Sequence, residues 1–134
     1  RLGLRYYEKQ DYARAVEWFR KAAELGDKDA CYWLGNCYYD GYGVEQDYAQ
    51  AVEWYRKAAE EGDEYACYRL GTCYLQGRGV KKDLTQAVKC FREAAEQWHK
   101  DAQLALADCY EKGRGVPKNP TLAARWRTKN KINT

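Results

Sequence analysis

The chain has 134 residues, of which 46% are apolar, so it is long enough for one compact domain or a short array of repeats. Its formal net charge of +3 is small and argues against general nucleic-acid binding. Serine is absent and there is one histidine, which removes the residue combinations that most hydrolases use. No stretch approaches the length of a membrane span or of a signal-peptide core, so we expect no membrane association.

A block of 36 residues recurs along the chain. Asp47 to Lys82 matches Asp11 to Gln46 at 24 of 36 positions, and Asp83 to Lys118 keeps the same frame without a gap. A fourth copy begins at Asn119 and stops early. A fixed period of this length is typical of solenoid proteins, because one repeat cannot bury its apolar face without a neighbour.

Leu2 to Glu8 is predicted to be the end of a first helix. The pair Leu2-Gly3 aligns with Leu34-Gly35, which lies in the middle of a later helix, so we expect the first turn of this helix to precede the sequence given. The link to Asp11 is four residues shorter than in later copies and lacks their Gly-x-Gly-Val segment. This arrangement leaves an open apolar end on which a second copy could pack, giving a homodimer. The residues concerned are Leu2, Leu4 and Tyr6.

One helix of each repeat is predicted to begin at an aspartate or asparagine and to carry an apolar stripe. The predicted N-caps are Asp11, Asp47, Asp83 and Asn119. From Tyr48 to Ala59, apolar residues recur at i, i+3, i+4, i+7, i+10 and i+11, which is one face of a helix. Gly26 and Gly62 are expected to end these helices in the left-handed conformation that glycine tolerates.

The other helix begins at Asp27 or Asp63, and its core positions repeat in every copy. In the first full copy they are Ala30, Leu34, Cys37 and Tyr38. A Gly-x-Gly-Val segment follows each of these helices and has two interpretations, an anion-binding loop or a helix-ending turn whose valine packs on the core. Its recurrence in every unit favours the turn, because phosphate loops occur singly after a strand.

Trp98 and His99 stand where the earlier copies have Gly-Asp. A bulky residue in the left-handed region costs about 1 kcal/mol or more. Either the helix that begins at Asp83 runs on, or the turn re-forms around Trp98, and we expect a local irregularity. His99 has no nucleophile beside it in the sequence and is interpreted as incidental.

The last helix is predicted to begin at Asn119-Pro120, with cap and proline in the favoured order. Its apolar stripe then fails, since Arg127, Asn130 and Lys131 replace apolar residues of the earlier copies. We interpret this as the polar outer face of a terminal repeat. The basic segment from Arg125 to Lys131 could instead contact nucleic acid, but a solvated capping helix explains it without a ligand.

These patterns, A-x-x-x-L-G-x-x-Y, G-x-G-V and D-x-x-x-A-V-x-W-[YF]-x-K-A-A-x-x-G, resemble Sel1-like repeats, which are relatives of tetratricopeptide repeats. The matching residues are Ala30, Leu34, Gly35, Tyr38, Gly41, Gly43, Val44, Ala51, Trp54, Tyr55, Ala58, Ala59 and Gly62. The resemblance implies an all-α fold, a right-handed α-α superhelix (solenoid) of about three and a half helix pairs. It covers a single array, with units at about 1–26, 27–62, 63–98 and 99–134. It implies binding of proteins or peptides and no cofactor.

The six cysteines are expected to be free thiols. Cys37, Cys73 and Cys109 are 36 residues apart, as are Cys31 and Cys67, and stacked helices lie about 8–10 Å apart, whereas disulfides need Cα atoms within about 7 Å. A cysteine-rich bacterial branch of the family joins each helix pair with a disulfide between cysteines eight residues apart. Here Cys31 and Cys67 match one cysteine of each such pair, but alanine stands eight residues before them, at 23 and 59. The resemblance therefore supports a reduced, cytoplasmic protein.

In related tetratricopeptide arrays the helix carrying L-G-x-x-Y lines the concave side. The copies differ most on its outward face, which we interpret as a peptide groove with tyrosine anchors, although exposed tyrosines could also merely shield the solenoid surface. The predicted peptide-binding residues are Tyr7, Tyr32, Asn36, Tyr39, Tyr65, Tyr68, Thr72 and Asp108. No lysines stand where some such arrays hold a carboxylate, so an apolar or basic ligand fits better than an acidic one.

The remaining residues that we considered give weaker indications of a functional site. Trp18 and Trp54 are expected to pack between repeats, and no Cys–His spacing suggests a metal site. The favoured function is a non-enzymatic interaction scaffold. The alternatives are a self-associating fragment or a β-lactam-binding or hydrolysing enzyme, as linked to the cysteine-rich branch. Without serine, an S-x-x-K nucleophile is impossible, and a cysteine nucleophile would have to use His99.

Overall fold

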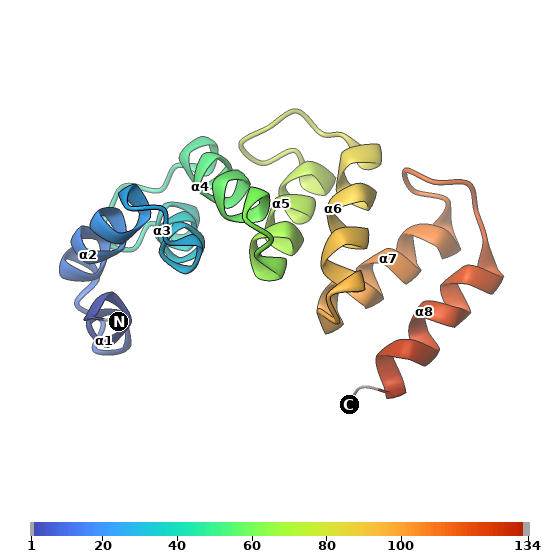
Figure 1. Cartoon of the computed structure of the whole chain (residues 1–134). Helices are drawn as coiled ribbons and strands as arrows, with labels where there is room; N and C mark the ends of the chain where they lie inside the picture. Colours follow the sequence, from blue (N-terminus) through green and yellow to red (C-terminus); the bar gives the residue numbers. More distant parts are fainter. Residues whose placement is uncertain (1, 133–134) are drawn as a thin grey trace. The chain divides into compact units, whose positions relative to one another are not determined.

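The computed structural model describes residues 2–132, and these form eight α-helices and no strand (Figure 1). The helices are α1 Leu2–Glu8, α2 Tyr12–Glu24, α3 Lys28–Asp40, α4 Tyr48–Glu60, α5 Glu64–Gln76, α6 Leu84–Glu96, α7 Lys100–Lys112 and α8 Pro120–Ile132. The all-α prediction is therefore confirmed.

The chain divides into two compact units, residues 1–63 and 64–134. In the first unit, α2 packs against α1 and α3, and α4 packs against α3. In the second, α6 packs against α5 and α7, and α8 packs against α7. Within each unit, every helix thus covers the apolar face of the next, as the repeat pattern predicts.

The helices begin where the sequence predicts, because polar side chains satisfy their first amides. The side chains of Asp11, Asp47 and Asp83 each accept from the amide three residues on, at 3.4, 3.1 and 3.1 Å. Asn119 caps α8 in the same way, at 3.0 Å from the amide of Leu122. An N-cap of this kind stabilises a helix by about 1 kcal/mol.

The Gly-x-Gly-Val segments are helix-ending turns, as expected. Gly41 and Gly113 hold left-handed φ angles of 74° and 67°, and the amide of Gly41 donates to the carbonyl of Cys37. The following valines, Val44 and Val116, are half-buried. This geometry satisfies the last carbonyls of each helix, which explains why the segment recurs in every repeat.

The close approach of paired helices depends on a glycine facing an aromatic ring. A Cβ added at Gly35 would lie 2.7 Å from the ring of Tyr55, and one at Gly71 would lie 2.7 Å from the ring of Phe91. In the last pair alanine stands at the glycine position, at Ala107, and the aromatic position holds Arg127. The glycine therefore occurs where an aromatic ring needs the space.

All six cysteines are free thiols, as predicted, and all are buried as small core residues. Burial raises the pKa of the Cys37 thiol to about 12 and that of the Cys73 thiol to about 11. Thiols with such pKa values stay protonated at neutral pH and are poor nucleophiles.

The turn at Trp98 re-forms, and the alternative of a continuous helix is wrong. Trp98 adopts a φ of 67°, and the amide of His99 donates to the carbonyl of Ala94 at 3.1 Å. The amide of Asp27 makes the same bond to Ala22, also at 3.1 Å. Packing of α6 against α7 thus imposes the turn on a tryptophan, at a conformational cost of about 1–2 kcal/mol.

The prediction of a solvated polar face on the last helix is wrong at Asn130. This side chain is buried, and its Nδ2 donates to the carbonyl of Lys100 at 2.9 Å and to Oε1 of Gln103 at 3.2 Å. Gln103 occupies the position of Cys31 and Cys67 in the earlier copies. A buried amide pair therefore replaces apolar packing here, and each amide finds its partner on the facing helix.

Candidate peptide-binding surface

The predicted tyrosines of the first unit belong to one group of rings in tilted and edge-on contact, which we call the unit 1 aromatic cluster. Its members are Tyr7, Tyr32, Trp33, Tyr39, Tyr48 and Tyr55. The ring centre of Trp33 lies 5.0 Å from that of Tyr7 and 5.3 Å from that of Tyr32. Tyr39 lies 5.0 Å from Tyr48 and 6.4 Å from the buried Tyr55. The cluster thus has a buried floor and half-buried edges.

Tyr7 also borders the first link of the chain. Its ring centre lies 5.3 Å from that of Tyr12 and 6.3 Å from that of Tyr42, and these two rings stack on each other at 4.5 Å. Burial, followed by the effects of Cys37 and Asp40, raises the pKa of Tyr7 to about 12. The phenol is therefore a neutral hydroxyl throughout the physiological pH range.

In the second unit the predicted Tyr65 and Tyr68 flank His99. The imidazole stacks on the ring of Tyr68 at 4.8 Å and meets the ring of Tyr65 edge-on at 5.2 Å. Its Nδ1 accepts from the amide of Ala102 at 3.1 Å and so caps α7. The interpretation of His99 as incidental is wrong. Its alignment with Asp27, which caps α3, was the signal in the sequence.

Asn36 does not belong to an exposed face, and this prediction is also wrong. The side chain is 4% exposed, and its Oδ1 accepts from the hydroxyl of Tyr55 at 2.5 Å. In the second unit Phe91 replaces this tyrosine, and the equivalent Thr72 instead donates to the carbonyl of Tyr68 at 3.1 Å. The copies differ at this position because the partner on the next helix differs, and this difference does not indicate a ligand.

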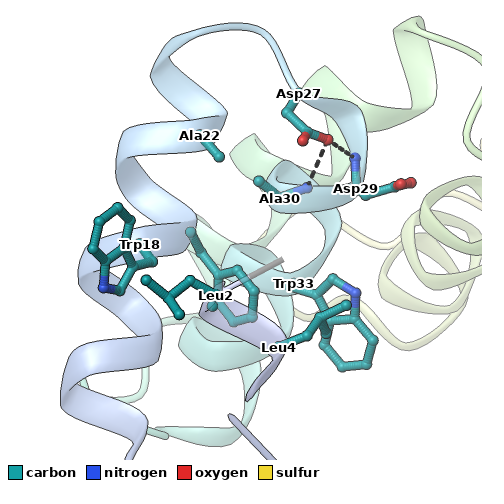
Figure 2. Close-up of a pocket in the computed structure, with 10 residues that line it drawn as sticks. Leu2, Leu4, Trp18, Ala22, Asp27, Asp29, Ala30 and Trp33 are labelled. Carbon is teal, nitrogen blue, oxygen red and sulfur yellow. Dashed lines mark hydrogen bonds between the residues drawn. The ribbon is translucent and has the colours of Figure 1, made fainter. Parts of the chain in front are cut away.

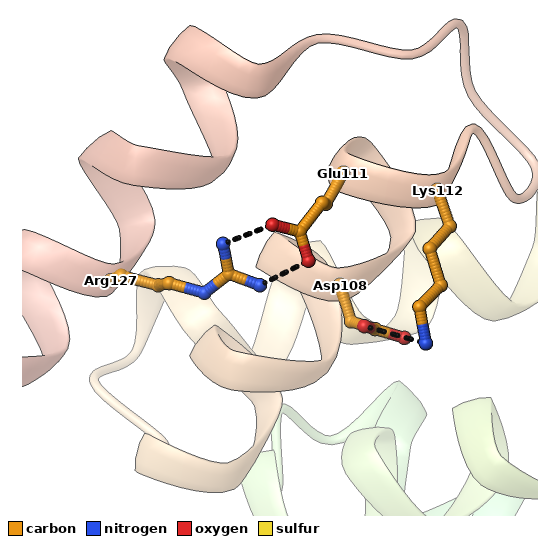
Figure 3. A network of polar contacts seen from close by, with 4 residues as sticks. All are labelled: Asp108, Glu111, Lys112 and Arg127. Carbon is orange, nitrogen blue, oxygen red and sulfur yellow. Dashed lines mark hydrogen bonds and ion pairs between the residues drawn. The ribbon is translucent and has the colours of Figure 1, made fainter.

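Asp108, the third equivalent, lies in a network of charged side chains (Figure 3). Its Oδ1 is 3.2 Å from Nζ of Lys112, while Arg127 makes two bonds of 3.0 and 2.9 Å to Glu111. The hydrogen bonds and charge of Arg127 lower the pKa of Glu111. All four groups are at least partly exposed, so solvent screens their attraction. The surface of the last pair is therefore charged, where the first pair presents tyrosines.

Two pockets flank these surfaces. The first lies in the first unit between α1, α2 and α3 and has a volume of about 230 Å³ (Figure 2). Its lining is mainly apolar and includes Leu2, Leu4, Trp18 and Trp33. Trp18 is 39% exposed, with Nζ of Lys21 4.8 Å from its ring centre, so it is only partly covered by neighbouring helices.

The second pocket lies in the second unit, where the N-termini of α5 and α7 meet the turn after α6. It has a volume of about 490 Å³, and we call it the Trp98 pocket. Its lining residues are Glu64, Tyr65, Gln97, Trp98, His99, Lys100 and Asp101. Trp98 and Tyr65 are 59% and 53% exposed, which is unusual for large aromatic side chains. The repeat pattern predicts no role for Trp98, which stands where the earlier copies have Gly26 and Gly62.

Within residues 2–132, no group of three or more His, Cys, Asp and Glu side chains is arranged to hold a metal ion. None of the helices in this range combines the length and the apolar character that crossing a membrane requires.

Solved structures with the same architecture span from two thirds to nearly all of the chain. The protective antigen c5321 of uropathogenic Escherichia coli, which displays an SLR fold, superposes with a TM-score of 0.95 and 44% identity over 98% of this chain and 29% of that one. A Sel1 repeat protein from Oxalobacter formigenes has a TM-score of 0.95 and 32% identity, over 99% of this chain and 55% of that one. Cysteine-rich protein B of Helicobacter pylori is 35% identical, with a TM-score of 0.64 over 66% and 67% of the two chains.

Among curated proteins, one from Helicobacter pylori strain J99 named "Putative beta-lactamase HcpC" is 43% identical over 44 residues, which is 33% of this chain and 15% of that protein. The chain thus spans a small part of this relative. A sequence profile of the Sel1 repeat matches residues 1–27, 28–63, 64–97 and 100–127. With this match over most of its length and the helical architecture described above, the chain belongs to the Sel1 repeat family.

Proposed function

We propose that the chain is a non-enzymatic scaffold whose four repeats act as one array and bind a peptide or partner segment. The observation that carries this proposal is the unit 1 aromatic cluster. Tyr7, Tyr32 and Tyr39 present half-buried rings above the buried Tyr55. Rings held in this way offer contact area and a polar tip while losing little conformational entropy on binding.

In this proposal, Asn36 acts indirectly. Its hydrogen bond to the hydroxyl of Tyr55 satisfies both buried polar groups and keeps the floor of the cluster in place. In the second unit, Tyr65 and Tyr68 contact the ligand beside His99, and Thr72 and Asp108 lie further along the same predicted row. A partner with apolar and basic groups suits these surfaces, because tyrosines dominate them and Asp108 is acidic.

The proposal is tested by selecting binding peptides from a displayed random library. We expect the selected peptides to lose at least roughly tenfold in affinity, or about 1.4 kcal/mol, for the Tyr32→Ala/Tyr39→Ala variant. The matched control is Leu25→Ala, which removes an apolar side chain that is 89% exposed and outside the cluster. If the tyrosine variant binds the peptides as tightly as the control does, the proposed surface is wrong.

The similarity to HcpC raises the possibility of β-lactam hydrolysis, and we propose that this chain does not catalyse it. Serine is absent from the sequence, and burial raises the pKa of Cys31, Cys37, Cys73 and Cys109. Nδ1 of His99 is engaged in capping α7. Nitrocefin turnover by the purified protein that disappears in a His99→Asn variant, which keeps a capping side chain, would contradict this proposal.

Self-association is a second candidate, and the pocket in Figure 2 supports it. Its lining is mainly apolar and includes Trp18 and Leu2, each of which is 39% exposed. We propose that a second copy of the chain covers this face. Sedimentation velocity should show a dimer that Leu2→Glu abolishes and the control Ile132→Glu leaves intact. A monomer at high concentration would contradict it.

The basic side chains of α8 fit a capping role better than nucleic-acid binding. Arg127 is paired with Glu111, and Lys129 lies with its Nζ 4.8 Å from the ring centre of Trp126. Binding to single-stranded RNA with a steep salt dependence would overturn this assignment.

We also propose a reducing, cytoplasmic environment, since the buried cysteines are all thiols.

A further inference from the structure

Trp98 occupies a backbone position that does not require a tryptophan. The two earlier turns of this kind hold Gly26 and Gly62 at φ angles of 91° and 85°, where glycine is unstrained. Trp98 holds φ at 67° and gains little burial in return, because it is 59% exposed. The amide of Trp98 donates to Ala95 at 3.0 Å, the same bond that Gly26 makes to Ala23, so the turn does not depend on the indole. A strained, exposed aromatic residue indicates a function other than folding.

The indole of Trp98 lies in a pocket with side chains that are held in place by their own contacts. Tyr65, on α5, lines the same pocket and is 53% exposed. His99 lines the same pocket and is held in place, because it stacks on Tyr68 at 4.8 Å and caps α7 through Ala102. Two exposed aromatic side chains therefore line a pocket one wall of which is held by stacking and by a helix cap.

The charged side chains of the pocket favour a cation. Glu64 lies in the first turn of α5 and Asp101 in the first turn of α7, and both line the pocket. Lys100 is the one charged group of opposite sign among the lining residues, which leaves a net charge of −1 with His99 neutral. Aromatic ring faces attract cations through their quadrupole, and carboxylates add to this attraction.

We propose that the Trp98 pocket binds an arginine side chain of the partner segment. This inference rests on the proposed scaffold function and deepens it by naming one residue of the ligand. A guanidinium is planar, stacks on aromatic rings and forms paired hydrogen bonds to a carboxylate, so it uses both features of the pocket. A volume of about 490 Å³ accommodates the guanidinium with its aliphatic stem.

Substitution of Lys100 tests whether the bound group is positively charged. Its ammonium lines the same pocket and opposes a bound cation, so Lys100→Gln should tighten binding of arginine. Glu64→Gln and Asp101→Asn should weaken it. If the ligand contacted only the apolar faces of the rings, none of these three substitutions would change its affinity.

The experiment titrates the whole chain with the tripeptide acetyl-Gly-Arg-Gly-amide and follows the indole N–H signals of the tryptophans by NMR. We expect a dissociation constant in the millimolar range, with the largest shift at the indole of Trp98. The same peptide with citrulline, which is isosteric but neutral, should bind at least roughly tenfold more weakly. Trp98→Gly should abolish binding while the protein remains folded.

The proposal would be overturned by equal binding of the citrulline peptide, by tighter binding of a glutamate peptide, or by unchanged arginine binding in Trp98→Gly. The absence of any shift at about 50 mM peptide would also overturn the proposal, because a weaker dissociation constant would not indicate a binding site. The Tyr32→Ala/Tyr39→Ala experiment reports on the scaffold separately. Loss of the arginine site alone would leave the peptide surface of the first unit standing.

Discussion

The turn at Gly26-Asp27 in the first unit and the turn at Trp98-His99 in the second have the same backbone and different side chains. Both make three equivalent hydrogen bonds, and the side chains of Asp27 and His99 both accept from the amide three residues on, at 3.3 and 3.1 Å. Helix packing on either side therefore determines the turn, and the residues in it are free to vary if one of them can cap. The second unit uses this freedom to expose an indole.

A second comparison concerns the contact between paired helices. The first unit joins Asn36 to Tyr55 by a buried hydrogen bond, whereas the second has Thr72 and Phe91 at the same positions. Both positions change together, because a buried amide without the hydroxyl would lose its partner. Matched changes of this kind can be broken or exchanged by mutation, which gives the following predictions.

The largest effect is expected from closing the space that glycine leaves. In Gly35→Ala the new Cβ would lie 2.7 Å from Tyr55 and 3.3 Å from the carbonyl oxygen of Ala51. Overpacking should lower the free energy of unfolding by about 2 kcal/mol, despite the better helix propensity of alanine. Urea unfolding measures this, and Gly71→Ala in the second unit should behave alike. A loss below about 0.5 kcal/mol in both variants would show that the rings can move aside.

A somewhat smaller effect is expected from Tyr55→Phe. The change leaves the buried Oδ1 of Asn36 without its donor, which should cost about 1.5 kcal/mol. Adding Asn36→Thr copies the pair of the second unit, and the double variant should be more stable than the single one. Chemical denaturation of the four proteins of this cycle gives the coupling energy. If the stability effects of the two single substitutions simply add in the double variant, the hydrogen bond does not explain why both positions change together.

Opposite effects of about 1 kcal/mol are expected when the two turns are exchanged. Trp98→Gly should raise the thermal midpoint, because it relieves the left-handed strain at φ 67°. Gly26→Ala should lower it, and since a Cβ at Gly26 meets nothing within 4 Å, its cost is purely conformational. A fall in stability for Trp98→Gly would indicate that the indole contributes packing.

The last prediction concerns alkaline pH. Burial raises the pKa of Cys37 and Tyr7 to about 12, and of Cys73 to about 11, above the values of about 9 and 10 expected for unfolded thiols and phenols. The folded state binds more protons there, so stability is fully present below about pH 9 and is lost as the pH rises towards 12. Unfolding measured from pH 7 to 10.5 should show this decline.

The matched control for the pH experiment is Cys37→Ala. This variant should start from lower stability at pH 7, because it leaves a cavity, and should decline less steeply above pH 9. An identical pH dependence of the two proteins would show that the Cys37 thiol is not responsible.

The sequence by itself determined the eight helices of residues 2–132, their aspartate and asparagine caps and the family, because each of these depends on contacts within one repeat that recur every 36 residues. Only the tertiary structure decided that Asn36 and Asn130 are buried and that His99 is a cap stacked on Tyr68. The physical reason is the range of the contact. Tyr55 is 19 residues from Asn36, and Gln103 is 27 residues from Asn130, so each polar side chain is matched by a partner on another helix, which a pattern within one helix does not contain.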